Sequence, residues 1–210
     1  MVCWKADELV SLGTAISDFV ASQSVQEALK QWAAHTALAG ALVASFAWPL
    51  VALSAMAPVD NAWSVALQRA EVTGALLARL IQERRLQDRP VSLLGYSLGA
   101  KAIFCCLQLL ASSGHHGAIE DVYLVGGPMS ASDHKAWRQA RSVVSGRFVN
   151  GFASRDAVLG IIYRATHLDT PAGLSPVCLP GVEDVDLSRL IKSHSEYASK
   201  MDDCVAAMRV

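Results

Sequence analysis

The chain has 210 residues and a mass of 22.4 kDa, a size typical of one domain with a full hydrophobic core. Its net charge is −1 and its isoelectric point is about 6.6, which gives no electrostatic basis for binding nucleic acid. Hydrophobic residues make up 52% of the chain and charged residues 18%, so the apolar excess requires a large buried sheet, an exposed apolar surface or a membrane.

The first part of the chain is predicted to be helical. We expect a very short strand at 2–4 and then a helical region over 5–86. The last helix of this region is expected over about 62–85, where apolar side chains recur at helical spacing, and Asp60 and Asn61 are expected to cap it.

The run 37–57 within this region carries no charge and is long enough to span a bilayer. It is rich in alanine, however, and Pro49 is expected to kink it. A single crossing would also place the strand at 2–4 and any later strand on opposite sides of the membrane. We therefore favour a buried helix or a lid on a membrane surface over a transmembrane span.

The most informative motif is Gly95-Tyr96-Ser97-Leu98-Gly99, because an apolar segment of strand length precedes it and a helix-forming segment follows it. Strand, Gly-x-Ser-x-Gly and helix are the context of a nucleophile elbow. Gly95 and Gly99 are expected to leave room where the turn crowds two backbones. The turn would expose the Ser97 hydroxyl and direct the first helical N–H groups to the same place. The alternative is a glycine-rich tight turn of an ordinary α/β sheet.

The second half of the chain alternates between strand and helix patterns. Such alternation predicts a mostly parallel sheet with helices on both faces, in one domain over 1–210 whose catalytic core is 87–210. The expected strands are 90–94, 121–125, 147–153 and 182–187, and the expected helices between and after them are 100–110, 132–141, 158–164 and 195–208.

A serine nucleophile needs a histidine to take its proton and a carboxylate to orient that histidine. Parallel strands present their carboxyl ends at one edge of the sheet, so the acid should follow a later strand. Asp156 comes directly after the predicted strand 147–153. It could instead only cap the helix that follows. The rival carboxylates are Asp133, a predicted helix cap, and Asp169, Asp184 and Asp186.

The histidine should follow the last strand, and His194 does so. The alternative for His194 is an ordinary surface histidine. His167 comes too early, beside the acid's own helix, and His115 and His116 are expected at the opposite end of the sheet. His35 and His134 precede the expected position as well.

Several stretches resemble the family of transmembrane and coiled-coil domain-containing protein 4, also described as domain of unknown function 726. The similarity covers essentially the whole chain, and its most specific parts are the Gly-x-Ser-x-Gly segment and Ser145-Gly146-Arg147. The stretches that carry it are 61–70, 89–100, 143–150, 183–186 and 193–197. The resemblance implies a lipase-like branch of the α/β-hydrolases, often membrane-associated, with Ser97, Asp156 and His194 as the catalytic triad.

Members of that family carry a long region before the segment that matches Trp4. We therefore expect an N-terminally truncated α/β-hydrolase-like fold with a large helical insertion before the nucleophile strand. Part of the oxyanion hole would be missing, which leaves the backbone N–H of Leu98 as the identifiable donor. Activity would be impaired, and an edge of the sheet would be exposed.

The resulting hypothesis is an intracellular, membrane-associated serine hydrolase that acts on an ester of a lipid or another apolar acyl group. The second hypothesis is a non-catalytic lipase-like scaffold for membrane or protein binding. The five cysteines are odd in number and show no Cys-x-x-Cys spacing, so reduced thiols are predicted rather than disulfides or a zinc site. No metal or organic cofactor is implied, and protein partners are unknown.

Overall fold

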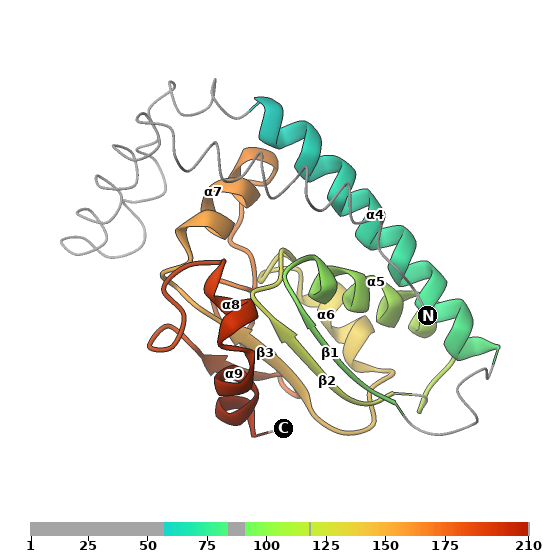
Figure 1. The fold of residues 1–210 in the computed structure, drawn as a ribbon. Coiled ribbons are helices and arrows are strands. Elements are labelled where there is room, and N and C mark those ends of the chain that lie inside the picture. The colour runs from blue at the N-terminus through green and yellow to red at the C-terminus, as the bar shows by residue number, and fades with distance from the viewer. Residues whose placement is uncertain (1–56, 84–90, 118, 210) are drawn as a thin grey trace, which may run out of the picture. The chain divides into compact units, whose positions relative to one another are not determined.

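The structure of the protein is a computed structural model that describes residues 57–83, 91–117 and 119–209 (Figure 1). The predicted strand at 2–4, the helical region before residue 57 and all of the apolar run 37–57 except its last residue lie outside these described residues. The residues Leu67–Val210 form one compact unit, whose boundary falls within a long helix. Within the described ranges, every helix is too short or too polar to cross a bilayer.

The centre of this unit is a parallel sheet of four strands in the order β1-β2-β3-β4. It is flanked by helices, so the predicted α/β class with a parallel sheet is confirmed (Figure 1). The strands are β1 (Val91–Tyr96), β2 (Ile119–Val125), β3 (Phe148–Phe152) and β4 (Glu183–Asp186). The helices are α4 (Ala57–Gln82), α5 (Leu98–Ser112), α6 (His134–Arg141), α7 (Ala157–Thr166), α8 (Glu196–Ser199) and α9 (Met201–Met208).

From residue 90 to β4 the predicted boundaries lie within two residues of those in the structure, but two helices differ more. The helix α4 begins at Ala57, so Asp60 and Asn61 lie inside it and do not cap it. A proline is tolerated in the first turn of a helix, and Pro58 occupies that turn. The closing helix is split at Lys200, whose backbone leaves the helical conformation (φ −115°, ψ 19°) while its ammonium group donates to the Leu190 carbonyl oxygen at 2.9 Å.

The alternation of side chains along the strands builds a core on each face of the sheet. On β2, Val122 and Leu124 join the core formed with α5 and α6, whereas Tyr123 and Val125 join the core formed with α8 and α9. Trp137 of α6 is fully buried in the first core. The central strands β2 and β3 therefore bury most of both faces, as is typical of a parallel sheet covered by helices, whereas alternate residues of β1 are exposed.

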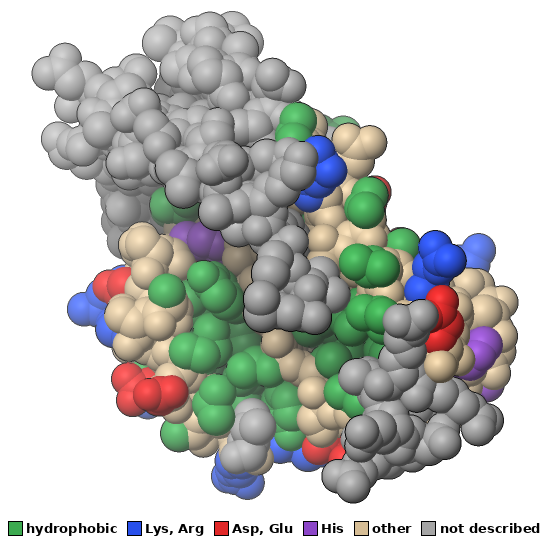
Figure 2. Space-filling view, turned by 45° about the vertical axis from the view of Figure 1, so that its right-hand side comes forward, with side chains coloured by type: hydrophobic (Ala, Val, Ile, Leu, Met, Phe, Trp, Pro, Cys, Tyr) green, Lys and Arg blue, Asp and Glu red, His purple; other side chains and the backbone are tan. Residues whose placement is uncertain are grey.

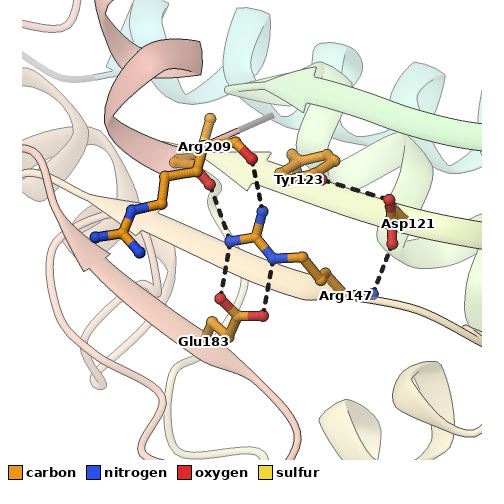
Figure 3. A network of polar contacts seen from close by, with 6 residues as sticks. Asp121, Tyr123, Arg147, Glu183 and Arg209 are labelled. Atoms are coloured by element: carbon orange, nitrogen blue, oxygen red, sulfur yellow. Dashed lines mark hydrogen bonds and ion pairs between the residues drawn. The ribbon is translucent and has the colours of Figure 1, made fainter.

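Arg147, the last residue of the Ser145-Gly146-Arg147 segment, forms a polar clamp at the start of β3 (Figure 3). The Arg147 guanidinium binds both carboxylate oxygens of Glu183 in β4, at 3.0 and 2.8 Å. It also donates to the carbonyl oxygens of Met208 and Arg209 at the end of α9, each at 2.9 Å. Carbonyls at the end of a helix lack partners within the helix, and a cation there is stabilising. The clamp therefore joins α9 to the sheet.

Replacing Arg147 by Met is expected to lower the thermal midpoint and to speed hydrogen exchange in α9. Arg147 holds the pKa of Glu183 below its usual value, chiefly through their hydrogen bonds. A lowered carboxylate pKa stabilises the fold fully above about pH 5, and this contribution declines as the pH falls through the lowered pKa. The midpoints of R147M and wild type should therefore differ less at pH 3 than at pH 7. Exposed Arg138 on α6 supplies the control, R138M, which should match wild type.

Candidate active site

Ser97 occupies the turn between β1 and α5. Its backbone has φ 53° and ψ −125°, a conformation that costs energy for a residue other than glycine. The Ser97 N–H donates to the Val125 carbonyl oxygen at 2.9 Å, which anchors this turn to the neighbouring strand β2. The strained turn therefore lies at the carboxyl end of β1 and at the first residue of α5.

The two glycines of the motif have different roles. A Cβ on Gly95 would lie 2.7 Å from the Ile103 side chain and 2.8 Å from the Gly99 carbonyl carbon, so the first turn of α5 requires glycine there. A Cβ on Gly99 would meet nothing within 4 Å. The expectation that close packing demands both glycines is therefore correct for Gly95 and wrong for Gly99.

Replacing Gly95 by Ala is expected to cost about 3 kcal/mol, because backbone atoms of Gly99 cannot move aside easily. For a chain of this size the loss corresponds to a fall of about 6–12 °C in the thermal midpoint. Gly99→Ala should instead leave the midpoint unchanged or raise it slightly, because alanine is the better helix former. Calorimetry of the two variants measures this difference, and equal midpoints would contradict the packing account.

Asp156 follows β3 and is fully buried. Its Oδ1 accepts the backbone N–H of Leu159 at 3.1 Å, so it caps α7. Its Oδ2 lies 2.6 Å from Nδ1 of His194. The two readings of this residue from sequence, helix cap and partner of a histidine, are therefore both present in the structure, one on each carboxylate oxygen.

His194 lies in the loop between β4 and α8. Its Nδ1 meets Asp156, and its Nε2 lies 2.7 Å from Ser97 Oγ. An ionised carboxylate can only accept a hydrogen bond, so Nδ1 carries the proton and Nε2 is left to accept the serine hydroxyl. The His194 side chain keeps 20% of its surface exposed, whereas that of Asp156 is closed off from water. One end of the chain of hydrogen bonds is thus open to solvent and the other is buried.

The rival carboxylates have other partners. Asp133 accepts a backbone N–H at the start of α6 at 3.0 Å and is the predicted cap. Asp184 lies in β4 and accepts two backbone N–H groups of the preceding loop and the side-chain amide of Asn150 in β3. Asp169 accepts hydrogen bonds from the hydroxyls of Ser130 and Tyr163. Asp186, at the end of β4, accepts the backbone N–H two residues later.

The other histidines lie elsewhere. His115 and His116 are in the turn after α5, and His116 Nδ1 lies 3.0 Å from the Ser142 carbonyl oxygen. His134 begins α6, and His167 follows the last residue of α7. His35 lies outside the described residues.

Leu98 is the first residue of α5 and directly follows Ser97. Backbone N–H groups in the first turn of a helix have no carbonyl partner within the helix and are directed out of its end. The helix end therefore brings hydrogen-bond donors and a partial positive charge to the serine. Negative charge that develops beside Ser97 Oγ would be stabilised there.

Sequence reasoning missed Tyr197, which the structure packs against the site. Its ring is fully buried, and its centroid lies 5.6 Å from that of the His194 ring at an interplanar angle of 77°. The signal in the sequence was that Tyr197 comes three residues after His194, because residues three apart on a helical turn are neighbours. A buried aromatic residue at that spacing is, however, equally typical of an ordinary core position.

The model of a protein family matches the chain over residues 1–210, and the family is described as "Protein of unknown function (DUF726)". The chain belongs to this family. The DUF726 assignment agrees with the resemblance found from the Gly-x-Ser-x-Gly and Ser-Gly-Arg segments. It carries no assigned activity.

Curated relatives of this DUF726 chain have informative names. A rice protein named "Transmembrane and coiled-coil domain-containing protein STS1" is 42% identical over 198 residues, which are 93% of this chain and 30% of the relative. The fission yeast "Uncharacterized membrane protein C6F6.13c" is 39% identical over 210 residues, 99% of this chain and 27% of the relative. The budding yeast "Probable lipase MIL1" is 37% identical over 202 residues, 94% of this chain and 18% of the relative.

The chain thus spans less than a third of the length of these relatives. Two of the three names place the relative in or across a membrane, and one name gives a probable lipase. No solved structure matches the chain.

Proposed function

We propose that this chain is the hydrolase part of a lipase-like serine hydrolase with an α/β-hydrolase fold, which cleaves esters of apolar acyl groups. Ser97 is the nucleophile, His194 the general base and then the general acid, and Asp156 the orienting carboxylate. The observation that carries the proposal is the unbroken line of contacts from Ser97 Oγ through the His194 ring to a buried Asp156 carboxylate, at 2.7 and 2.6 Å.

The first half of the reaction forms an acyl-enzyme. Ser97 Oγ attacks the ester carbonyl carbon while its proton passes to His194 Nε2. The carbonyl oxygen becomes an oxyanion, and Asp156 stabilises the imidazolium through Nδ1–H. The carbon–oxygen bond to the alcohol then breaks, and Nε2 returns the proton to the departing alkoxide. The acyl group remains on Ser97.

The second half repeats the sequence with water. Nε2 of His194 takes a proton from a water molecule, and the resulting hydroxide attacks the acyl carbon. The bond to Ser97 Oγ breaks, and the proton moves from the imidazolium to the serine oxygen. The backbone N–H of Leu98, at the N-terminus of α5, donates to the oxyanion in both halves.

An apolar substrate is favoured by the surface beside Ser97. Leu94 and Tyr96 lie on β1, the strand that leads to Ser97, and are 44% and 41% exposed, so this strand presents large apolar side chains at the surface. On the face shown in Figure 2, hydrophobic side chains gather in the middle of the described surface and charged side chains lie toward its margins. The names of relatives, a probable lipase and membrane proteins, support a lipid substrate or a membrane surface as partner.

The test is covalent labelling with an alkyl fluorophosphonate. An active serine attacks phosphorus and expels fluoride, which leaves a stable adduct on Oγ. We expect one adduct per chain, located by mass spectrometry in the tryptic peptide that contains Ser97 and ends at Lys101. Chain unfolded in urea before the reaction is the control and should not label, because the reactivity depends on folded geometry.

A folded chain that gives no adduct, or gives one at another serine, would exclude this hydrolase function. The lipase-like scaffold for membrane or protein binding would then be the better account. If the adduct forms, p-nitrophenyl esters of two to eight acyl carbons measure acyl preference. A rise in kcat/KM with acyl length is the expected result.

A further inference from the structure

Tyr197 lies on α8, three residues after His194, and no step of the proposed reaction uses it. We infer that Tyr197 is a positioning residue whose ring holds the His194 imidazole in line between Asp156 and Ser97. This inference rests on the proposed function and adds a requirement to it. Tyr197 acts through His194 and touches no reacting atom.

The ring of Tyr197 packs against His194 and against the carboxyl ends of the strands β1 and β2. It lies edge-on to the His194 ring, with the centroids 5.6 Å apart. On β1 it packs against Tyr96, the residue before Ser97, with the centroids 6.4 Å apart. At the end of β2 its ring carbons lie 2.8 Å from where a Cβ on Gly126 would be. The ring therefore fills the space beneath the histidine and meets the strand that leads to the serine.

Gly126 makes this packing possible. Its backbone has φ 56°, which favours glycine, and any larger residue would put its Cβ inside contact distance of the Tyr197 ring. The close approach of backbone to ring means that Tyr197 cannot shift toward β2. The Tyr197 ring is thus held in place and limits the movement of the partly exposed His194 side chain.

The hydroxyl group of Tyr197 shows whether the residue acts through packing of its ring or through a hydrogen bond. The group is buried and has no hydrogen-bond partner among the described residues. Burial raises the pKa of Tyr197, and the nearby charge of Asp156 raises it further, so the phenol stays neutral. A buried donor without a partner adds no stability. The role therefore belongs to the aromatic ring, and phenylalanine should perform it.

Loss of the Tyr197 ring would remove the packing against the His194 imidazole and open space beside Asp156. Smaller side chains leave a cavity that surrounding atoms fill only in part. The imidazole could then turn away from the line between the carboxylate and the serine. A displacement of about 1 Å in a catalytic group can lower the rate about 100-fold.

The experiment compares three variants of the chain with wild type: Tyr197→Phe, Tyr197→Leu and the control Tyr123→Leu. Tyr123 is a tyrosine of the same core, 4% exposed, whose ring meets Arg147 at the opposite end of the sheet. The readouts are kcat and KM with p-nitrophenyl butyrate, the thermal midpoint, and the downfield proton NMR signal of the His194 Nδ1–H bound to Asp156. Asp156→Asn assigns that signal by removing it.

Tyr197→Phe should keep kcat within about twofold of wild type, with an equal or higher thermal midpoint. Tyr197→Leu should lose about 100-fold in kcat with little change in KM, and its Nδ1–H signal should broaden or vanish. Tyr123→Leu should lower the thermal midpoint but keep both the signal and kcat. If Tyr197→Leu does not fold, Tyr197→Met, which fills more of the space, takes its place.

The inference is overturned if Tyr197→Leu keeps the signal and the kcat of Tyr123→Leu, or if Tyr197→Phe is as impaired as Tyr197→Leu. Failure of the proposed function gives a different result. In that case wild type forms no phosphonate adduct and has no esterase activity, whereas the Nδ1–H signal still reports whether Tyr197 holds His194 on Asp156.

Discussion

Replacing Ser97 by Ala is expected to reduce kcat with p-nitrophenyl butyrate by about 10⁶-fold, to the background set by substrate binding and the helix end. The variant removes only the oxygen that lies 2.7 Å from His194 Nε2. The partly exposed histidine can bind water in its place, so the fold should be unaffected. Steady-state kinetics with extensively purified protein measure the loss.

The matched control is Ser112→Ala, in the same helix α5 but at its other end. The Ser112 hydroxyl is exposed and donates to the Leu109 carbonyl oxygen at 2.9 Å. This variant should keep wild-type kcat and wild-type labelling by the fluorophosphonate. A Ser97→Ala variant that retains more than a small part of the activity would show that another group is the nucleophile.

Replacing Asp156 by Asn is expected to reduce kcat by about 10⁴-fold while leaving the thermal midpoint close to that of wild type. Asparagine can keep Oδ1 as the acceptor for the Leu159 N–H, and it is as good a helix cap as aspartate. Its other atom becomes an NH₂ group, which cannot accept the His194 Nδ1–H. The imidazole would turn or adopt the other tautomer, and Nε2 could no longer take the serine proton.

The control for this second variant is Asp133→Asn. Asp133 caps α6 with the same kind of hydrogen bond, from Ala136 N–H at 3.0 Å, whereas Asp156 caps α7. Asp133→Asn should retain wild-type kcat. Equal kinetics for the two asparagine variants would mean that Asp156 serves only as a cap. Circular dichroism of both variants checks that α6 and α7 are intact.

The order of elements after residue 90 was predictable, because apolar segments of strand length alternate with helix patterns over the whole second half. The parallel sheet and its flanking helices follow from that alternation. The positions of Ser97, Asp156 and His194 after successive strands were also predictable, and the structure brings their side chains together. Their catalytic roles stay a proposal that the two substitutions above test.

Boundaries set by backbone detail were less predictable. Asp60 and Asn61 have the composition of a helix cap, yet Pro58 is equally suited to the first turn, and α4 begins before it. Lys200 has a good helix-forming side chain, but its contacts with Leu190 and Glu196 accompany a break between α8 and α9. Local propensities are weak compared with tertiary contacts of this kind.

The linear chain alone determined the class of fold, the strained turn that carries Ser97 and the order in which acid and histidine arrive, because strand and helix periodicities and glycine spacing are local properties. Tertiary structure decided that Asp156 serves both a helix and a histidine, that Gly95 is needed where Gly99 is not, and that Tyr197 lies against the imidazole. Each of these depends on distances between segments far apart in the chain, which local patterns do not encode.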